Sequence, residues 1–286
     1  MKVGVFLKEI RIEHTLFALP FAYTGAIVAA RGIPSWPALL WITLAVLGAR
    51  TAAMAVNRYL DRDIDARNPR TARRALASGK LSAASMLWAT AAGLVLLVWS
   101  AWMLNPLCVK LLPIAAVLLL AYPLCKRFTW TTHFVLGAVD GLAPLGAYVA
   151  IAGGIGIPGV LLFVAVTLWV AGFDIIYALM DLGVDREQGI ASVPARFGER
   201  SGYVVPLALH GAMLLALAAA GWVADAAWPY YAGVAANAIL IVYEKRLLDA
   251  SENVFVLNER VFIANMAFSL VFLASAAIGF AAGRPA

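Results

Sequence analysis

The chain has 286 residues, of which 63% are hydrophobic and 13% charged, with a formal net charge of +6. A soluble globular domain carries about 25% charged residues, so the composition excludes an ordinary soluble protein. Apolar runs of about 20 residues recur along the chain, and each is long enough to cross a bilayer as a helix. We therefore predict an all-α polytopic membrane protein, and we attribute the positive charge to topology and not to nucleic-acid binding.

Nine spans are predicted, within a single domain over residues 1–286. In chain order they cover residues 12–31, 36–60, 82–104, 107–124, 131–152, 158–182, 202–222, 228–248 and 259–281. The segment before the first span is amphipathic and interrupted by charge, so no cleavable signal peptide is expected.

The connections between these spans alternate in charge. The N-terminus and residues 61–80, 126–127, 183–200 and 245–260 are basic, whereas the other connections lack Lys and Arg. The Lys and Arg residues outside the basic set are Arg31, Arg50, Arg58, Lys110 and Arg284. Because basic loops stay on the cytoplasmic side, the N-terminus is predicted inside a cytoplasmic (inner) membrane and the C-terminus outside.

The most charged stretch follows the second span. Residues 57–74 read NRYLDRDIDARNPRTARR, with three aspartates and six arginines. Asn57, Asp61 and Asp65 are spaced by four residues, so they share one face of a helix. Carboxylates beside hydrocarbon are costly without a partner, which predicts a bound cation.

A similar motif follows the sixth span, where Tyr177, Asp181 and Asp185 are again spaced by four. Two such motifs four spans apart indicate two related four-helix halves, about 12–124 and 131–248, followed by a ninth helix over 259–281. We expect the halves to enclose a central cavity with both motifs at its cytoplasmic mouth.

Hard oxygen ligands without a His or Cys cluster suit Mg²⁺. Since Mg²⁺ takes one or two carboxylates and completes its shell with water and phosphate oxygens, two facing motifs predict a diphosphate held through bridging Mg²⁺. Lys126 and adjacent arginines would neutralise the remaining phosphate charge. Charges at span ends are often only solvated, and Asp63, Arg67, Arg70, Glu187 and Glu199 are interpreted in that way.

Four stretches resemble the UbiA superfamily of intramembrane prenyltransferases, over essentially the full length. They are NRYLDRDID (57–65), RTARRALASGKLS (70–82), YPLCKRFT (122–129) and DIIYALMDLGVDREQGIASVPARFG (174–198). The resemblance implies nine transmembrane helices and Mg²⁺-dependent transfer of a prenyl group from a prenyl diphosphate to an acceptor. By their positions in these stretches, the residues implied to bind the metal and the diphosphate are Asn57, Asp61, Asp65, Asp181 and Asp185. Phosphate contacts are implied for Arg73, Lys126, Arg127 and Tyr177. Arg58 is a further candidate to bind the diphosphate or the acceptor acid.

Residues 10–30, IRIEHTLFALPFAYTGAIVAA, and the ending GIASVPARFG resemble the quinone-pathway branch that prenylates aromatic acids. The acceptor in that branch is 4-hydroxybenzoate or a dihydroxynaphthoate, and the sequence does not separate the two. The implied partners are therefore a prenyl diphosphate, an aromatic acid and the lipid bilayer, with no obligate protein partner. Electrophilic substitution is expected, in which Tyr177, Phe173 or Tyr148 would stabilise an allylic cation.

The acceptor carboxylate needs a cation, for which Arg62 and Arg50 are candidates. Arg50 falls in mid-span, so it needs a partner, and an ion pair with Asp140 or Asp174 is the alternative interpretation. Asp140 would otherwise orient the acceptor hydroxyl. Among the histidines, His14 is a candidate for the cavity mouth, while His133 and His210 are interpreted as structural.

Two other classes of protein remain as alternatives. A transporter of cations or metabolites also uses intramembrane acids and repeats, although here the acids cluster at one membrane face instead of the midplane. A CDP-alcohol phosphotransferase resembles DGxxAR followed by GxxxDxxxD, which this sequence lacks. Within the superfamily, an enzyme with a haem, chlorophyll or lipid acceptor is the third alternative.

Overall fold

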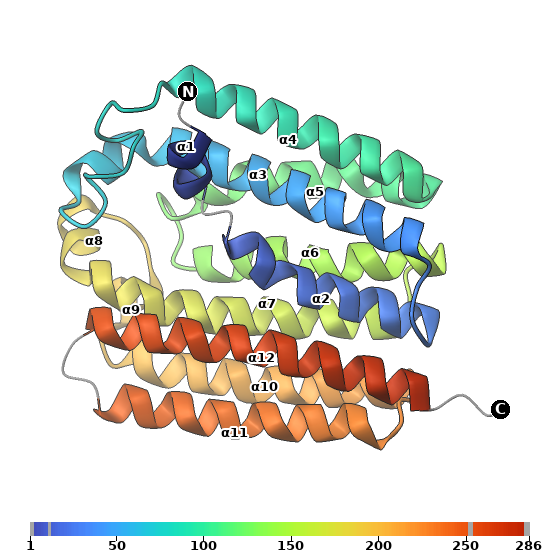
Figure 1. The fold of residues 1–286 in the computed structure, drawn as a ribbon. Helices are drawn as coiled ribbons and strands as arrows, with labels where there is room; N and C mark the ends of the chain where they lie inside the picture. The colour runs from blue at the N-terminus through green and yellow to red at the C-terminus, as the bar shows by residue number, and fades with distance from the viewer. Residues whose placement is uncertain (1–2, 11–12, 251–253, 283–286) are drawn as a thin grey trace.

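In the computed structural model the chain folds into long helices that run side by side (Figure 1). The structure describes residues 3–10, 13–250 and 254–282, and it describes no side chains at 3, 13–17, 249–250, 254–259 and 282. The elements are α1 (Val3–Glu9), α2 (Glu13–Ala30), α3 (Trp36–Arg67), α4 (Ala83–Leu104), α5 (Pro106–Cys125), α6 (Thr132–Ala152), α7 (Ile157–Ala178), η1 (Leu179–Asp181), α8 (Leu182–Gln188), α9 (Val193–Phe197), α10 (Ser201–Val223), α11 (Trp228–Ala250) and α12 (Val254–Ala282).

Each predicted span coincides with one long helix, which confirms the all-α fold. Within the described residues, seven segments are long and apolar enough to cross a membrane: Trp36–Arg67, Ala83–Leu104, Pro106–Cys125, Thr132–Ala152, Ile157–Gln188, Ser201–Val223 and Arg260–Ala281. The helices α2 and α11 fall outside this set. Nine membrane crossings therefore stay a prediction.

The charged connections gather at one end of the bundle. Figure 1 shows α1, the connection between α3 and α4, and the short helices α8 and α9 together at this end. The C-terminal end of α12 lies at the opposite end of the bundle. The two acidic motifs therefore lie at the same end of the molecule, as the repeat predicted.

The second acidic motif does not lie on a uniform α-helix, which corrects the prediction from its spacing. Between Ala178 and Leu182 the chain forms the single 3₁₀ turn η1 before it continues as α8. The helix α8 ends at Gln188, and Gly189, which follows it, has a positive φ of 69°. A 3₁₀ helix completes a turn in three residues and not 3.6, so the turn changes the direction of the side chains that follow it.

Small residues allow several helices to approach closely. A Cβ on Gly48 of α3 would clash with the backbone of Gly93 on α4, and the reverse is also true. A Cβ on Gly25 of α2 would clash with the backbone of Pro144 on α6. Such contacts are typical of membrane helices, where close packing replaces the hydrophobic effect as the attractive force.

The largest apolar core lies among α2, α7, α10, α11 and α12. Its centre is aromatic, with Trp169 stacked on Phe268 at a centroid distance of 5.2 Å. The helices α3 to α6, on the other side of α7 and α2, enclose space that side chains do not fill, and this space contains the candidate site.

Candidate functional site

A polar cavity of about 230 Å³ lies at the charged end, among α3, α5, α6, α7 and α8. Its lining contains most of the side chains that the sequence singled out: Asn57, Arg58, Asp61, Asp65, Lys126, Asp174, Tyr177, Asp181 and Asp185. The fold therefore brings the two acidic motifs, 112 to 128 residues apart along the chain, to one cavity.

On the α3 side the spacing of four puts Asp61 and Asp65 on successive turns of a continuous helix. Nζ of Lys126, at the end of α5, lies 2.5 Å from Oδ2 of Asp61. The other oxygen of Asp61, Oδ1, is buried without a hydrogen-bond partner. Nη1 of Arg74 lies 2.7 Å from both carboxylate oxygens of Asp65. One turn earlier, Asn57 donates a 2.8 Å hydrogen bond to the hydroxyl of Tyr122.

On the opposite wall, Asp181 accepts hydrogen bonds from the connection between α3 and α4. Nδ2 of Asn68 donates at 2.9 Å and Nε of Arg70 at 2.8 Å, while Nη2 of Arg70 reaches the second oxygen of Asp181. The Arg70 guanidinium also lies 5.4 Å from the ring centroid of Tyr177. Asp185 accepts a 3.3 Å hydrogen bond from the hydroxyl of Ser192.

Arg70 is thus part of the cavity, and its interpretation as a solvated charge was wrong. Asn68 ends α3 in an extended conformation, and its side-chain oxygen accepts from the backbone N–H of Arg70 at 2.9 Å. This local turn folds the connection back over the end of α3 and aims the guanidinium at Asp181. Burial lowers the pKa of Arg70, but the hydrogen bonds and charge of Asp181 outweigh it and raise the pKa. The Asn68-Pro69 pair, a turn signal, was the clue in the sequence.

Three arginines that were expected at the substrates do not line the cavity. Arg62 packs on the ring of Tyr59 at 4.8 Å, and its Nε lies 3.7 Å from Asp63. Arg73 is exposed, and Arg127 is exposed with Nη2 donating to the carbonyl of Leu60. Arg62 follows Asp61 by one residue, which rotates it about 100° around the helix, so the two side chains cannot share a face.

The deep charges form separate pairs. Nη1 of Arg50 donates a 2.8 Å hydrogen bond to Asp140, and both side chains are 15% exposed, which confirms the predicted ion pair and selects Asp140 as the partner. Asp174 instead binds Nδ1 of His133 at 2.7 Å. Nε2 of His133 accepts from the backbone N–H of Val193 at 3.1 Å. His133 therefore connects Asp174 to the start of α9, and it also lines the cavity, so its structural role stays a prediction.

Two further predicted contacts remain. The side chain of His14 lies outside the described residues, so its contact stays a prediction. Tyr148, a candidate for cation stabilisation, packs against Gly156 and Gly159 at the other end of α6 and α7. Phe173 lies closer, with its ring centroid 6.2 Å from that of Tyr177.

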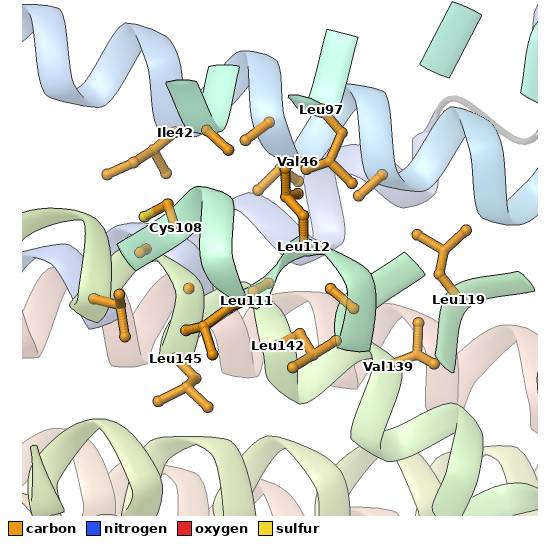
Figure 2. A pocket seen from close by; sticks show the side chains of 18 of the residues that line it. Ile42, Val46, Leu97, Cys108, Leu111, Leu112, Leu119, Val139, Leu142 and Leu145 are labelled. Carbon is orange, nitrogen blue, oxygen red and sulfur yellow. The ribbon is translucent and has the colours of Figure 1, made fainter. Parts of the chain in front are cut away.

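An apolar cavity of about 280 Å³ continues along the same helices. Figure 2 shows aliphatic side chains of α3, α4, α5 and α6 around it, among them Ile42, Val46, Leu97, Leu112 and Leu142. The charged residues of its lining are the paired Arg50 and Asp140. The two cavities adjoin at successive turns of α3 and α5. Ala53 and Leu119 line the apolar cavity, and Asn57 and Tyr122, about one turn further along each helix, line the polar cavity.

The donor set of the polar cavity fits Mg²⁺ bound together with phosphate. Within the described ranges no group of three His, Cys, Asp or Glu side chains is placed to hold a metal by itself. Mg²⁺ does not need such a cage, because it retains water and shares one or two carboxylates with phosphate oxygens. The buried, unpartnered Oδ1 of Asp61 supplies one free hard oxygen ligand.

The fold and the apolar helices define an α-helical integral membrane protein with a charged cavity at one end. The sequence model of the UbiA prenyltransferase family matches residues 18–267. The chain belongs to this family.

Relatives and solved structures agree with this assignment. The 4-hydroxybenzoate octaprenyltransferase of Nitrosococcus oceani is 35% identical over 282 residues, which cover 96% of this chain and 92% of the relative. The enzyme of the same name from Alkalilimnicola ehrlichii is 35% identical over 78% of this chain and 76% of its own length. An apo structure of a UbiA homolog from Aeropyrum pernix K1 is 33% identical, covers 92% of this chain and 97% of its own, and superposes with a TM-score of 0.84. A UbiA homolog from Archaeoglobus fulgidus bound to GPP and Mg²⁺, 18% identical with coverage of 95% and 99%, shares the fold with a TM-score of 0.71.

Proposed function

We propose that this protein transfers a polyprenyl group from a prenyl diphosphate to 4-hydroxybenzoate, as in ubiquinone biosynthesis, with Mg²⁺ as cofactor. The observation that carries the proposal is the meeting of two acidic motifs and several cations in one cavity that adjoins an apolar one. The relatives' names favour 4-hydroxybenzoate over a dihydroxynaphthoate, and they specify an octaprenyl group for those enzymes.

The proposed metal ligands are the four motif carboxylates of Asp61, Asp65, Asp181 and Asp185, with Asn57 beside them. Bound Mg²⁺ supplies positive charge that stabilises the departing diphosphate. Lys126, Arg70 and Arg74 form ion pairs with three of these carboxylates, which offsets the cost of burying their charges. The same three cations are the side chains best placed to bind phosphate oxygens when substrate enters.

The residues around the diphosphate would also protect the reacting carbon. As the allylic C–O bond breaks, the aromatic face of Tyr177 would stabilise the allylic cation. The helices exclude water that would otherwise capture this cation. The acceptor ring then attacks, and loss of a ring proton restores its aromaticity. Asp174 and His14 stay proposed substrate contacts at the cavity wall and mouth.

The apolar cavity is proposed to take the isoprenoid chain, because its lining is aliphatic and it begins one turn beyond Asn57 (Figure 2). Arg50, the basic residue among the described side chains of its lining, is the proposed contact of the acceptor carboxylate. Nε of Arg50 is buried without a hydrogen-bond partner, so a donor is available there. Asp140 would orient the acceptor through Arg50. Arg62 lies outside both cavities, so we assign it no substrate contact.

We further propose a single domain of two four-helix halves and a ninth helix, in which α2 and α11 complete nine crossings. The charged end and the N-terminus would face the cytoplasm, since basic connections are retained there.

Product formation by the purified protein tests the proposal. With Mg²⁺, geranyl diphosphate and 4-hydroxybenzoate, we expect a prenylated hydroxybenzoate by mass spectrometry and one pyrophosphate released per product. A parallel reaction with a dihydroxynaphthoate separates the two acceptors. If protein that binds geranyl diphosphate releases no pyrophosphate with either acid, the proposed reaction is wrong and the transporter alternative gains support.

A further inference from the structure

Glu9 is a buried carboxylate that neither acidic motif includes. It is the last residue of α1, a seven-residue helix at the charged end of the bundle, and it is 6% exposed. It does not line the polar cavity. A carboxylate is rarely buried unless its oxygens receive hydrogen bonds or pair with a cation, so its contacts indicate what it holds in place.

The Glu9 side chain binds the connection between α3 and α4. Its Oε2 accepts a 2.8 Å hydrogen bond from the backbone N–H of Ala75, and its Oε1 accepts one of 3.3 Å from Leu76. A charged acceptor makes such bonds stronger than neutral ones. The side chains of Ala75 and Leu76 are themselves buried, in a small core with Phe6 of α1 and Met86 of α4. The connection is thus fixed to α1 in two ways, by backbone hydrogen bonds to Glu9 and by apolar packing of its side chains.

Glu9 also binds α3. Nε of Arg58 donates a 3.1 Å hydrogen bond to the backbone carbonyl of Glu9, and the same nitrogen lies 3.9 Å from Oε1. Arg58 is 6% exposed and lines the polar cavity. One residue therefore connects the α3 helix to the chain segment that follows Arg74.

The connection matters because of Arg74, which immediately precedes Ala75. Nη1 of Arg74 lies 2.7 Å from both oxygens of Asp65, and this two-point contact depends on where the backbone places the side chain. Arg73, its neighbour, is exposed, so only one of these two adjacent arginines lines the cavity.

We infer that Glu9 is a positioning residue: it fixes the backbone at Ala75 and Leu76 and thereby holds the Arg74 guanidinium at the place where the diphosphate binds. The inference rests on the proposed function for the identity of the ligand. It predicts that Glu9 acts through Arg74, so its effect on diphosphate binding disappears when Arg74 has no guanidinium.

A double-mutant cycle tests this dependence. Glu9→Gln, Arg74→Ala, the double variant and the exposed control Lys8→Ala are compared with the parent protein. Two quantities are measured: KM for geranyl diphosphate and for 4-hydroxybenzoate, and the rise in Tm on addition of Mg²⁺ with inorganic pyrophosphate, which needs no turnover. Coupled residues give non-additive effects in such a cycle.

We expect Glu9→Gln to raise KM for geranyl diphosphate roughly tenfold, because a charged acceptor is lost from two backbone N–H groups. KM for 4-hydroxybenzoate should change less than about twofold, and the Tm rise with Mg²⁺ and pyrophosphate should shrink. In the Arg74→Ala background the same substitution should add less than about twofold. Lys8→Ala should behave like the parent.

Three results would overturn the inference. They are an unchanged Tm rise in Glu9→Gln, equal increases in both KM values, or additive effects in the double variant, which would make Glu9 only an anchor of α1. If the unliganded Glu9→Gln protein unfolds, Glu9→Asp replaces it, since the shorter side chain keeps the charge but cannot span the same contacts. A parent protein without turnover would refute the proposed function alone, because the Tm rise still tests the positioning.

Discussion

Arg70 offers the sharpest test of the polar cavity, because it comes from the first half of the chain and binds Asp181 of the second. We predict that Arg70→Ala raises KM for geranyl diphosphate about 100-fold and Arg70→Lys about tenfold. The guanidinium makes a two-point contact with Asp181 and lies over Tyr177 at 5.4 Å. A lysine retains the charge, but it loses the planar two-point geometry and the stacking.

The size of the expected KM increase follows from the hydrogen bonds to charged groups that are lost with the Arg70 guanidinium. A hydrogen bond to a charged group contributes about 1.5–3 kcal/mol, and each 1.4 kcal/mol changes binding tenfold. The side chains of Arg70 and Asp181 are 21% and 16% exposed, so solvent screening places the effect on stability at the lower end of this range. Asn68 also continues to donate to Asp181 at 2.9 Å. We therefore expect Arg70→Ala to destabilise the unliganded protein by about 1–2 kcal/mol.

The assay is pyrophosphate release against geranyl diphosphate concentration at saturating acceptor, with Tm of each purified variant. Arg67→Ala is the matched control, since Arg67 lies in the same segment but is exposed. If Arg70→Ala and Arg67→Ala both show a diphosphate KM within about twofold of the parent, the reasoning that places the diphosphate beside Asp181 is refuted.

Other predictions concern the metal, the acceptor and the packing. Chelation of divalent ions with EDTA should abolish turnover, and added Mg²⁺ should restore it. Asp181→Asn should lower kcat/KM at least about 100-fold, and full activity of this variant would exclude the two-motif metal site. Arg50→Ala should raise KM for 4-hydroxybenzoate about 10- to 100-fold and Arg62→Ala less than about twofold, as measured by product formation at varied acceptor; the reverse order would return the acceptor contact to Arg62. Gly25→Ala should destabilise the protein by about 1–3 kcal/mol, seen as a lower Tm, because the added methyl group meets a backbone carbonyl of α6, whereas Gly146→Ala, with open space at this position, should not lower Tm.

Several features of the site followed from the sequence because they are local. The residues of a helix have a fixed angular spacing, so Asn57, Asp61 and Asp65 had to share a face wherever the helix packed. The same rule excludes Arg62 from that face. The sequence was therefore sufficient to remove Arg62 as a candidate for the acceptor carboxylate, although we predicted that contact. The equivalent argument for Asp185 was incomplete, since the 3₁₀ turn before it was not predicted.

The arginines of the connection between α3 and α4 could not be sorted from the sequence. Arg70, Arg73 and Arg74 lie within five residues, yet two line the cavity and Arg73 is exposed. Their directions depend on a turn at Asn68 and on hydrogen bonds to Glu9, a residue more than 60 positions away. Contacts of this kind are non-local, so no spacing rule along the chain predicts them.

Composition and spacing alone therefore determined the class of protein, the all-α fold and the two acidic motifs, because apolar length and helical periodicity are properties of short segments. Only the tertiary structure decided which cations meet which carboxylates: Lys126 with Asp61, Arg74 with Asp65, Arg70 with Asp181, and Arg50 with Asp140. An ion pair forms where the packing of separate helices brings two charges within a few ångströms, and the sequence does not contain that distance.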